Sequence, residues 1–461
     1  MKKRCLGVLL LLTTILGGCG VAGQNAQVGS AGMSEAVAGY ENLAGKDTLA
    51  FGEGEKEKEG AEYVPPEMKG EVTISTMYEM EFLSVAAKRF MKQYPDVTIT
   101  INTCEGTGGA NADNDYRTWL NTKIMSGNVE DIIFTTWIPV KKYMDMGVFV
   151  DLSDFLSATP QINKENYFMN VIESARDDEG RLFIMPCASS LTVLSFDGEL
   201  AADIGRLGEA GSVRFSEAAA CAKPLVDKST VQNTFLSQDS GMTYMNALVE
   251  EYYSALVTDE GNVNINTPEY INMLLETEKL LKQGYFEVDN DIDYYNMEYC
   301  FIMNTDVDMQ SAFYNLTGDE CLGMPVADGE GNVCTGSQFC FGITESSQNK
   351  ELAWEFMKYV LSDEIQSSPS VPGLAVNRKG FEASAKKYLT VYTEGTGASV
   401  SLEDYKGLLE QWVNKINKCN IKDPVITQYF FEENTKFFDG LQSAEQTAQI
   451  LQNKVTQYLN E

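Results

Sequence analysis

The apolar residues of the segment 71–101 change their spacing twice, which predicts a strand, a helix and a second strand. Residues 72–75 alternate between apolar and hydroxyl side chains, the two-residue period of a strand. The next apolar residues lie three or four apart, as on one face of a helix that ends before Pro95. They are Phe82, Val85, Ala86 and Phe90. A second strand covers residues 97–101. This order within about thirty residues is typical of a parallel βαβ unit.

The loop after the first predicted strand is a candidate for one half of a binding site. Ligands of open parallel sheets bind beyond the carboxyl ends of the strands. The loop 76–81 lies at such an end and carries Tyr78 and Glu81. A second loop of this kind follows residues 129–134, a predicted buried strand, and carries Trp137.

Helical periods and extended runs continue to alternate along the chain, as expected of an α/β protein. Helices are predicted at residues 116–125, 140–146, 263–284 and 349–361. Thr267 and Pro268 supply an N-cap and a first-turn proline for the third of these helices. A last helix is predicted to begin with Ser443 and Gln446 as a capping box.

The first residues have the anatomy of an exported lipoprotein's leader. Three basic residues precede the apolar run 6–16, which is too short for a transmembrane helix. The run ends in LGGC, which resembles the bacterial lipobox. We therefore predict a lipoprotein signal peptide at 1–18, a lipid on Cys19, and a location at the outer face of the cytoplasmic membrane. Residues 19–69 lack periodicity and are predicted to form a disordered tether.

Length and charge narrow the classes of function. The 461 residues are enough for two or three domains, and they carry a net charge of −32, or −35 after the three basic leader residues are removed. A field of this sign repels phosphate backbones, so no nucleic-acid partner is predicted. The sequence contains no histidine, which removes Ser-His-Asp and Cys-His nucleophile pairs and imidazole ligands for zinc.

The cysteines and the acidic runs predict neither a metal site nor a cofactor. Eight cysteines remain after Cys5 and Cys19 are set aside, and whether any of them pair stays open. The acidic residues of the run 289–293 alternate as in a calcium loop. However, Tyr294 stands where that loop has glycine, and Cys300 where it has glutamate.

Six segments of the chain follow one another in the order typical of a known family. The longest is LNTKIMSGNVEDIIFTTWIPVKKYMDMGVFVDLSDFL at residues 120–156. The others are 167–186 (YFMNVIESARDDEGRLFIMP), 263–285, 349–362, 373–378 (GLAVNR) and the final helix. Together they resemble the family 1 extracellular solute-binding proteins, the lipoprotein receptors of ABC sugar importers, over roughly residues 71–461. The chain departs from the family in having Glu130-Asp131 where Pro-Asp is usual.

The resemblance implies an α/β fold of the two-lobed periplasmic-binding-protein type (type II). Each lobe would be a mainly parallel sheet flanked by helices, and several strands would form the hinge. We assign residues 70–187 and 300–343 to lobe 1, and residues 188–299 and 344–461 to lobe 2. The extended segments 180–195, 299–304 and 336–344 are the expected crossings between the lobes.

A carbohydrate site needs aromatic planes for the C–H faces of a sugar and fixed donors and acceptors for its hydroxyls. The candidates at strand ends that face the other lobe are Tyr78, Glu81, Trp137, Ser189, Ser190, Asp239, Tyr244, Tyr314, Asn315, Gln338 and Phe339. Trp137 and Tyr314 suit core packing as well as ligand stacking, and Asp239 suits a helix cap. For these three residues both roles stay open.

The function implied is that of a membrane-anchored receptor. It would capture a mono- or oligosaccharide between its lobes, as a monomer, and deliver it to the transmembrane subunits of an ABC permease. Its activity would be binding, not catalysis. One alternative is a glycoside hydrolase, which needs two carboxyl groups about 5–10 Å apart. Another is a sensory or scaffold lipoprotein with the same fold and no transport partner.

Overall fold

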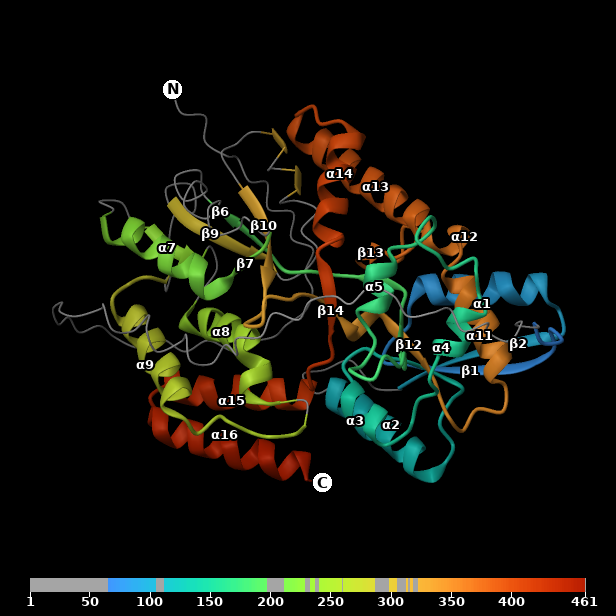
Figure 1. Cartoon of the computed structure of the whole chain (residues 1–461), viewed down its shortest axis with the longest axis horizontal. Coiled ribbons are helices and arrows are strands. Elements are labelled where there is room, and N and C mark those ends of the chain that lie inside the picture. Colours follow the sequence, from blue (N-terminus) through green and yellow to red (C-terminus); the bar gives the residue numbers. More distant parts are fainter. Residues whose placement is uncertain are drawn as a thin grey trace.

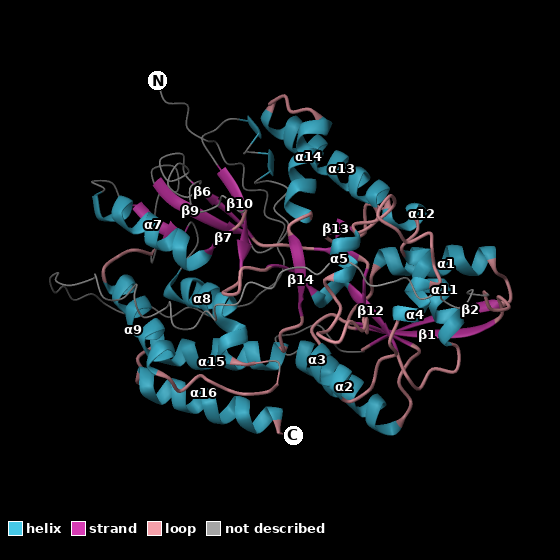
Figure 2. Cartoon of the chain, in the orientation of Figure 1, coloured by secondary structure: helices cyan, strands magenta, loops and turns pink. Residues whose placement is uncertain are grey.

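The computed structural model describes residues 65–104, 112–196, 211–228, 233–236, 240–258, 260–286, 298–304, 312–313, 316–317 and 322–460. The predicted leader, Cys19 and most of the predicted tether lie outside these ranges, as do Asp239, Tyr314, Asn315 and the run 289–293. The described elements form two α/β bodies on either side of a joint made of strands (Figures 1 and 2). None of the described helices has the length and apolarity that a membrane crossing needs.

The first body is built on a five-stranded sheet in the order β2-β1-β3-β12-β4. Its strands are β1 (Gly70–Thr76), β2 (Val97–Thr103), β3 (Ile132–Phe134), β4 (Met185–Pro186) and β12 (Cys340–Ile343). β1 lies parallel to β2 and β3, whereas β12 runs antiparallel to β3 and β4. Helix α1 (Glu81–Gln93) connects β1 to β2. The predicted βαβ unit is therefore confirmed.

Helices pack against this sheet through their apolar faces. The buried rings of Phe90 in α1 and Phe356 in α11 (Lys350–Val360) meet edge to face, with centroids 5.4 Å apart. Burial of a phenylalanine contributes about 1.5–3 kcal/mol to the free energy of unfolding. The remaining helices of this body are α2 (Ala112–Ser126), α3 (Val140–Asp145), α4 (Ser153–Ser157), α5 (Met169–Glu173), α12 (Asp363–Gln366), α13 (Arg378–Thr396) and α14 (Leu402–Val413).

A second sheet runs from the joint into the second body in the order β14-β11-β10-β6-β9-β8, with β7 paired to β10. Its strands are β6 (Val193–Phe196), β7 (Val213–Arg214), β8 (Asn233–Leu236), β9 (Glu298–Asn304), β10 (Leu322–Ala327), β11 (Val333–Gly336) and β14 (Ile416–Asn420). Ile416 and Cys419 of β14 belong to the first core, whereas Leu194 and Met324 belong to the second. One hydrogen-bonded sheet thus joins the two bodies.

The helices of the second body enclose a separate core. They are α7 (Phe215–Lys228), α8 (Ser240–Leu256), α9 (Pro268–Lys282), α15 (Pro424–Phe438) and α16 (Ala444–Leu459). The predicted caps are confirmed: the Thr267 side chain accepts a hydrogen bond from the Tyr270 backbone N–H, and Ser443 and Gln446 form a reciprocal capping box. These bonds satisfy N–H groups that a helix leaves unpaired at its start.

The two cores divide the chain differently from the predicted lobe boundaries. Helices α11, α13 and α14, which those boundaries place in lobe 2, bury residues in the first core. Strands β9 and β10, which the boundaries place mostly in lobe 1, belong to the second sheet. The periodicity of a helix shows which face is buried but not which sheet receives it. For this reason the sequence pattern did not determine to which lobe each helix belongs.

The crossings between the bodies also differ in part from the prediction. The first lies within the segment 180–195, between β4 and β6. The segment 299–304 is an interior strand of the second sheet, and 336–344 contains the 3₁₀ helix η3 (Ser337–Phe339) and β12 of the first body. After β9 the chain reaches the first core at Ala312 and Phe313 and enters the second sheet again at β10. It then crosses between β10 and β11 and leaves for the second body between β14 and α15.

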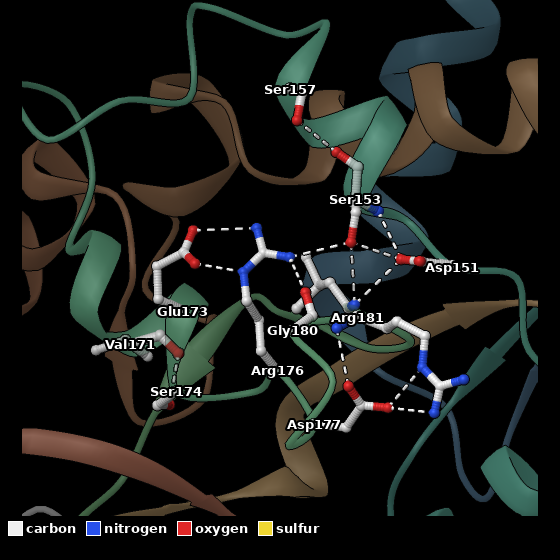
Figure 3. Close-up of polar contacts among 11 residues, drawn as sticks. Asp151, Ser153, Ser157, Val171, Glu173, Ser174, Arg176, Asp177, Gly180 and Arg181 are labelled. Atoms are coloured by element: carbon white, nitrogen blue, oxygen red, sulfur yellow. Dashed lines mark hydrogen bonds and ion pairs between the residues drawn. The ribbon is translucent and has the colours of Figure 1, made fainter. Parts of the chain in front are cut away.

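A polar turn fixes the chain before the first crossing (Figure 3). The Asp151 Oδ1 atom accepts hydrogen bonds from the backbone N–H groups of Ser153 at 2.9 Å and Leu182 at 3.1 Å. Arg176 Nη1 donates to the Gly180 carbonyl oxygen at 2.8 Å and to Ser153 Oγ at 3.0 Å. These bonds hold the end of α5 and the start of α4 against the strand segment that leads to β4.

Asp177 closes the same turn by pairing with Arg181 (Figure 3). Its Oδ2 atom accepts a hydrogen bond from Arg181 Nε at 2.8 Å, and its Oδ1 atom accepts one from the Arg181 backbone N–H at 2.8 Å. Burial raises the pKa of Asp177, but the hydrogen bonds and charge of Arg181 outweigh it and bring the pKa below 3.8.

We expect Asp177→Asn to lower the free energy of unfolding near neutral pH. A carboxyl whose pKa is depressed in the folded state stabilises the fold above its unfolded-state pKa, and this contribution is lost as pH falls through the folded-state pKa. The difference between wild type and variant should therefore shrink in acid. Urea unfolding at about pH 7 and about pH 3 measures it, and an unchanged difference would contradict the assignment.

A second prediction concerns the joint. Asn170 Nδ2 in α5 donates to the carbonyl oxygens of Val413 and Ile416, both at 2.9 Å, and so fixes the start of β14. Asn170→Ala should cost about 1–3 kcal/mol, because it removes two hydrogen bonds to carbonyl groups of buried residues. Asn128→Ala is the control, since that exposed amide reaches Ser126 Oγ at the surface, and it should change stability by less than about 0.5 kcal/mol. Equal effects of the two variants in urea unfolding would refute this role.

Candidate functional site

The turn that follows β3 lies beside η3. The Thr135 backbone N–H donates to the Cys340 carbonyl oxygen at 3.0 Å, and the Thr135 hydroxyl donates to the Ser337 carbonyl oxygen. The Thr136 hydroxyl donates to the Gln338 carbonyl oxygen at 2.9 Å. Two segments about two hundred residues apart in sequence are thereby joined at the carboxyl end of a parallel strand, where ligands of α/β sheets bind.

Ser190, at the start of the first crossing, extends this group. Gln338 Nε2 donates to Ser190 Oγ at 3.2 Å, and the Ser190 backbone N–H donates to Thr335 Oγ1 at 3.1 Å. Together, Thr136, Trp137, Ser190, Thr335 and Gln338 form what we call the strand-end cluster. The cluster offers hydroxyl and amide groups where the first body meets the shared sheet.

Trp137 presents an exposed indole ring at this place. Its side chain is 53% exposed, and its backbone φ angle is +56°. Among the described residues it is the one non-glycine residue with a positive φ. The left-handed conformation costs about 1–2 kcal/mol for an L-residue. Arg117 Nη1 in α2 donates to the Trp137 carbonyl oxygen at 3.3 Å, and this bond helps hold the strained turn.

Tyr78 lies at the equivalent end of the neighbouring strand. β1 and β3 are parallel neighbours, so the loops after them leave the same edge of the sheet. The Tyr78 side chain is 44% exposed, and its carbonyl oxygen accepts a hydrogen bond from the Thr76 hydroxyl at 3.0 Å. Burial raises the pKa of the phenol, which therefore keeps its proton at neutral pH.

The structure places the other predicted residues in different surroundings. Glu81 is exposed at the start of α1. Ser189 is buried in β5 (Ala188–Ser189), where its hydroxyl donates at 3.4 Å to the Leu374 carbonyl oxygen in β13 (Leu374–Ala375). Phe339 is half-buried against the first core. Tyr244 lies in α8 of the second body.

Tyr244 packs as a core residue of the second body. Its ring contacts Phe215 at 5.1 Å and Phe286 at 5.3 Å between centroids. The structure therefore brings together Trp137, Ser190 and Gln338, with Tyr78 on the same sheet edge, and does not include Tyr244. Asp239, Tyr314 and Asn315 lie outside the described residues, so they remain predictions.

Sequence reasoning missed Arg117 and the residue that it reaches in the second body. Arg117 is only 4% exposed. Its Nη1 atom also donates to Asp113 Oδ2 at 3.0 Å, and its Nη2 atom donates to Gln428 Oε1 in α15 at 3.4 Å. The sequence signal was an aspartate four residues before an arginine on a helix, but this pair is also common on solvated surfaces.

The two bodies meet at a second point on the same side, where α3 lies beside α15 and α16 in Figure 1. The Lys142 ammonium lies 4.4 Å from the centroid of the Tyr458 ring. The Tyr458 hydroxyl donates to Asp423 Oδ2 at 2.9 Å. Burial raises the pKa of Asp423, while the hydrogen bond from Tyr458 opposes that shift.

The cluster suits binding of a neutral polar ligand. Within the described residues, no three His, Cys, Asp or Glu side chains are grouped to hold a metal ion. A hollow of about 580 Å³ lies elsewhere, along α16, lined by Leu441, Gln442, Glu445, Gln446, Gln449 and Ile450. It belongs to one body and shares no residue with the strand-end cluster.

The strain at Trp137 yields a prediction that does not require a ligand. Trp137→Gly should be more stable than Trp137→Ala by about 1 kcal/mol, because glycine adopts a positive φ without steric penalty. In helix α2 the order should reverse, with Trp119→Ala more stable than Trp119→Gly by about 1 kcal/mol. Urea unfolding of the four variants measures both differences. Equal free energies of unfolding for Trp137→Ala and Trp137→Gly would show that the turn is unstrained.

Comparison of the sequence with known proteins gave no match to a protein-family model and none to a curated protein. Comparison of the structure gave many matches. The sugar-binding protein MalE from Xanthomonas citri aligns with a TM-score of 0.55 at 14% identity, over 85% of this chain and 98% of its own. An ABC substrate-binding protein from Listeria monocytogenes in complex with cycloalternan aligns with a TM-score of 0.51 at 17% identity, over 85% and 99%.

A third similar structure is an extracellular solute-binding protein of family 1 from Alicyclobacillus acidocaldarius. It aligns with a TM-score of 0.51 at 15% identity, over 85% of this chain and 99% of its own. These alignments cover nearly the whole of each neighbour, and the described α/β bodies and joining sheet agree with them. The chain therefore has the two-lobed α/β fold of the extracellular solute-binding proteins, as the sequence predicted. The sheets are mixed, however, and not mainly parallel as predicted, because β12 is antiparallel to β3 and β4, and β6 is antiparallel to β9 and β10.

Proposed function

We propose that this protein is a solute receptor that captures a carbohydrate between its two bodies and delivers it to an ABC importer. The observation that carries the proposal is the exposed indole of Trp137, held beside hydroxyl and amide groups at a strand end. Sugars present weakly polar C–H faces, which stack on aromatic planes, and hydroxyl edges, which need fixed donors and acceptors. The strand-end cluster supplies both kinds of group.

The position of the cluster supports the same proposal. Thr335 is part of β11, and Ser190 precedes β6, so both belong to the joint. A ligand held there would contact the segments through which the bodies move relative to each other. Its binding free energy can then favour one arrangement of the bodies over another.

The ligands of the structural neighbours agree with a carbohydrate. One neighbour was solved with cycloalternan, another is a sugar-binding protein, and a third binds cyclic α-maltosyl-1,6-maltose in Arthrobacter globiformis. These neighbours are binding proteins, which supports binding rather than catalysis as the activity of this chain. We further propose that the receptor carries a lipid on Cys19, that its partners are the transmembrane subunits of a permease, and that it is monomeric.

Thermal-shift screening of mono- and oligosaccharides, cycloalternan among them, tests the proposal. At least one carbohydrate should raise the melting temperature, because a ligand that binds the folded state stabilises it. Trp137→Ala should then weaken binding of that carbohydrate by about tenfold or more in calorimetry, equivalent to about 1.4 kcal/mol.

Phe431→Ala is the matched control, because Phe431 in α15 is also 53% exposed but lies in the second body and outside the cluster. It should bind like wild type. Equal binding by the Trp137 and Phe431 variants would rule out the cluster as the site. Products released from an oligosaccharide by the purified protein would indicate a glycoside hydrolase instead.

A further inference from the structure

The guanidinium group of Arg117 touches three parts of the molecule at once. It donates to Asp113 on its own helix, to the backbone carbonyl of Trp137, and to Gln428 in the second body. The side chain is almost entirely buried. A buried arginine is costly unless its donors are satisfied, so these acceptors are required for its placement. An arginine that served only its own helix would have no need of the two distant acceptors.

Gln428 moves with the second body. Its neighbours in α15, Ile426 and Phe430, are buried in the second core. Its amide Nε2 donates to Glu432 Oε1 at 2.9 Å, one turn further along the helix. This bond orients the amide so that Oε1 faces Arg117. A displacement of the second body would therefore displace the Gln428 acceptor of the Arg117 guanidinium group.

Trp137 is the part of the first body that can respond. Its backbone is in the left-handed region, which persists only where the surroundings hold it. The bond from Arg117 to its carbonyl oxygen is one such restraint, and the hydroxyl bonds of Thr135 and Thr136 to η3 restrain the preceding residues. A change in the direction of the Arg117 guanidinium group would move the Trp137 carbonyl group to which it is bonded. The orientation of the indole ring would then change as well.

We propose that Arg117 is a positioning residue that couples the placement of the second body, through Gln428, to the orientation of the Trp137 ring. The guanidinium fork is required, because a lysine ammonium is a compact group that cannot span three acceptors on three elements. The consequence for ligand affinity rests on the proposed carbohydrate function. The coupling itself is a property of the protein without ligand and can be measured separately.

The experiment measures acrylamide quenching of Trp137 fluorescence in the full-length protein without ligand. The signal of Trp137 is isolated from that of the other three tryptophans by subtracting the spectrum of the matching variant that also carries Trp137→Phe. The backgrounds are wild type, Gln428→Ala, Arg117→Lys and the double variant. Gln428→Glu loses the amide donor to Glu432, but both of its carboxylate oxygens can accept from Arg117, so it serves as the rescue variant. Lys142→Ala breaks a separate contact between the bodies and serves as the control.

Gln428→Ala should raise the quenching constant of Trp137 by at most about twofold, because the ring is already 53% exposed. In the Arg117→Lys background the same substitution should add nothing, since the connection is already broken. Gln428→Glu and Lys142→Ala should quench like wild type. This pattern distinguishes coupling from a general loosening of the fold, which Lys142→Ala would also produce.

The proposal is overturned if Gln428→Ala leaves the Trp137 signal unchanged, if it acts equally with and without Arg117, or if Lys142→Ala gives the same change. If Gln428→Ala fails to fold, the other two variants test the proposal. The quenching constant of Trp137 must then differ from wild type in Arg117→Lys and equal wild type in Gln428→Glu. For any carbohydrate that binds wild type, Gln428→Ala should weaken binding about three- to tenfold. Absence of carbohydrate binding would reject the proposed function and leave the coupling intact.

Discussion

The antiparallel pairing of β3 with β12 is the constraint on which the candidate site depends. Phe341 pairs with Phe134 in the register, and their buried rings meet edge to face with centroids 4.8 Å apart. A shift of one residue would turn these rings to the opposite face, so the buried side chains determine the register. The residues after β3 must then lie beside those before β12. The hydroxyls of Thr135 and Thr136 pair there with carbonyls of η3, groups that would otherwise lack partners.

The shared sheet joins the bodies and also sets where they can move. β6 pairs with β10 through four residue pairs, as β11 does with β14, but the register of β10 with β11 consists of the pair Ala327 and Val333. That narrow connection lies where one core ends and the other begins. A rotation about this point would leave each packed core intact, because the change would be confined to a few backbone angles of the crossings.

Local features of the sequence predicted local structure well. The βαβ unit and the caps at Thr267 and Ser443 follow from spacing and cap chemistry within a few residues, and the structure confirms them. Features that depend on partners far along the chain were harder to predict from the sequence. Tyr244 was predicted as a site residue at a strand end, but its ring packs against Phe215 and Phe286, which lie about thirty and forty residues away.

Arg117 shows the same limit for the site itself. Its acceptor in α15 is separated from it by 311 positions, and no local pattern connects the two. The rule that ligands bind beyond the ends of strands was sufficient to select Trp137, Ser190 and Gln338, because it depends only on where strands end. It could not reveal what holds Trp137 in its conformation. Supporting residues are therefore found only when the fold is known, although the residues that they support can be proposed from sequence.

The chemistry of the cluster makes strain at Trp137 compatible with the proposed binding role. Its groups are hydroxyls, an amide and an indole, and Arg117, whose guanidinium bonds to the Trp137 carbonyl oxygen, has Asp113 as its ionic partner at 3.0 Å. A site without net charge selects a ligand by shape and by the directions of its hydrogen bonds. Such selection requires the aromatic plane to be fixed before the ligand arrives, since ordering it on binding would reduce affinity. A left-handed residue held by neighbouring hydrogen bonds would fix the backbone that carries this ring, at a cost of about 1–2 kcal/mol that two separate cores can sustain.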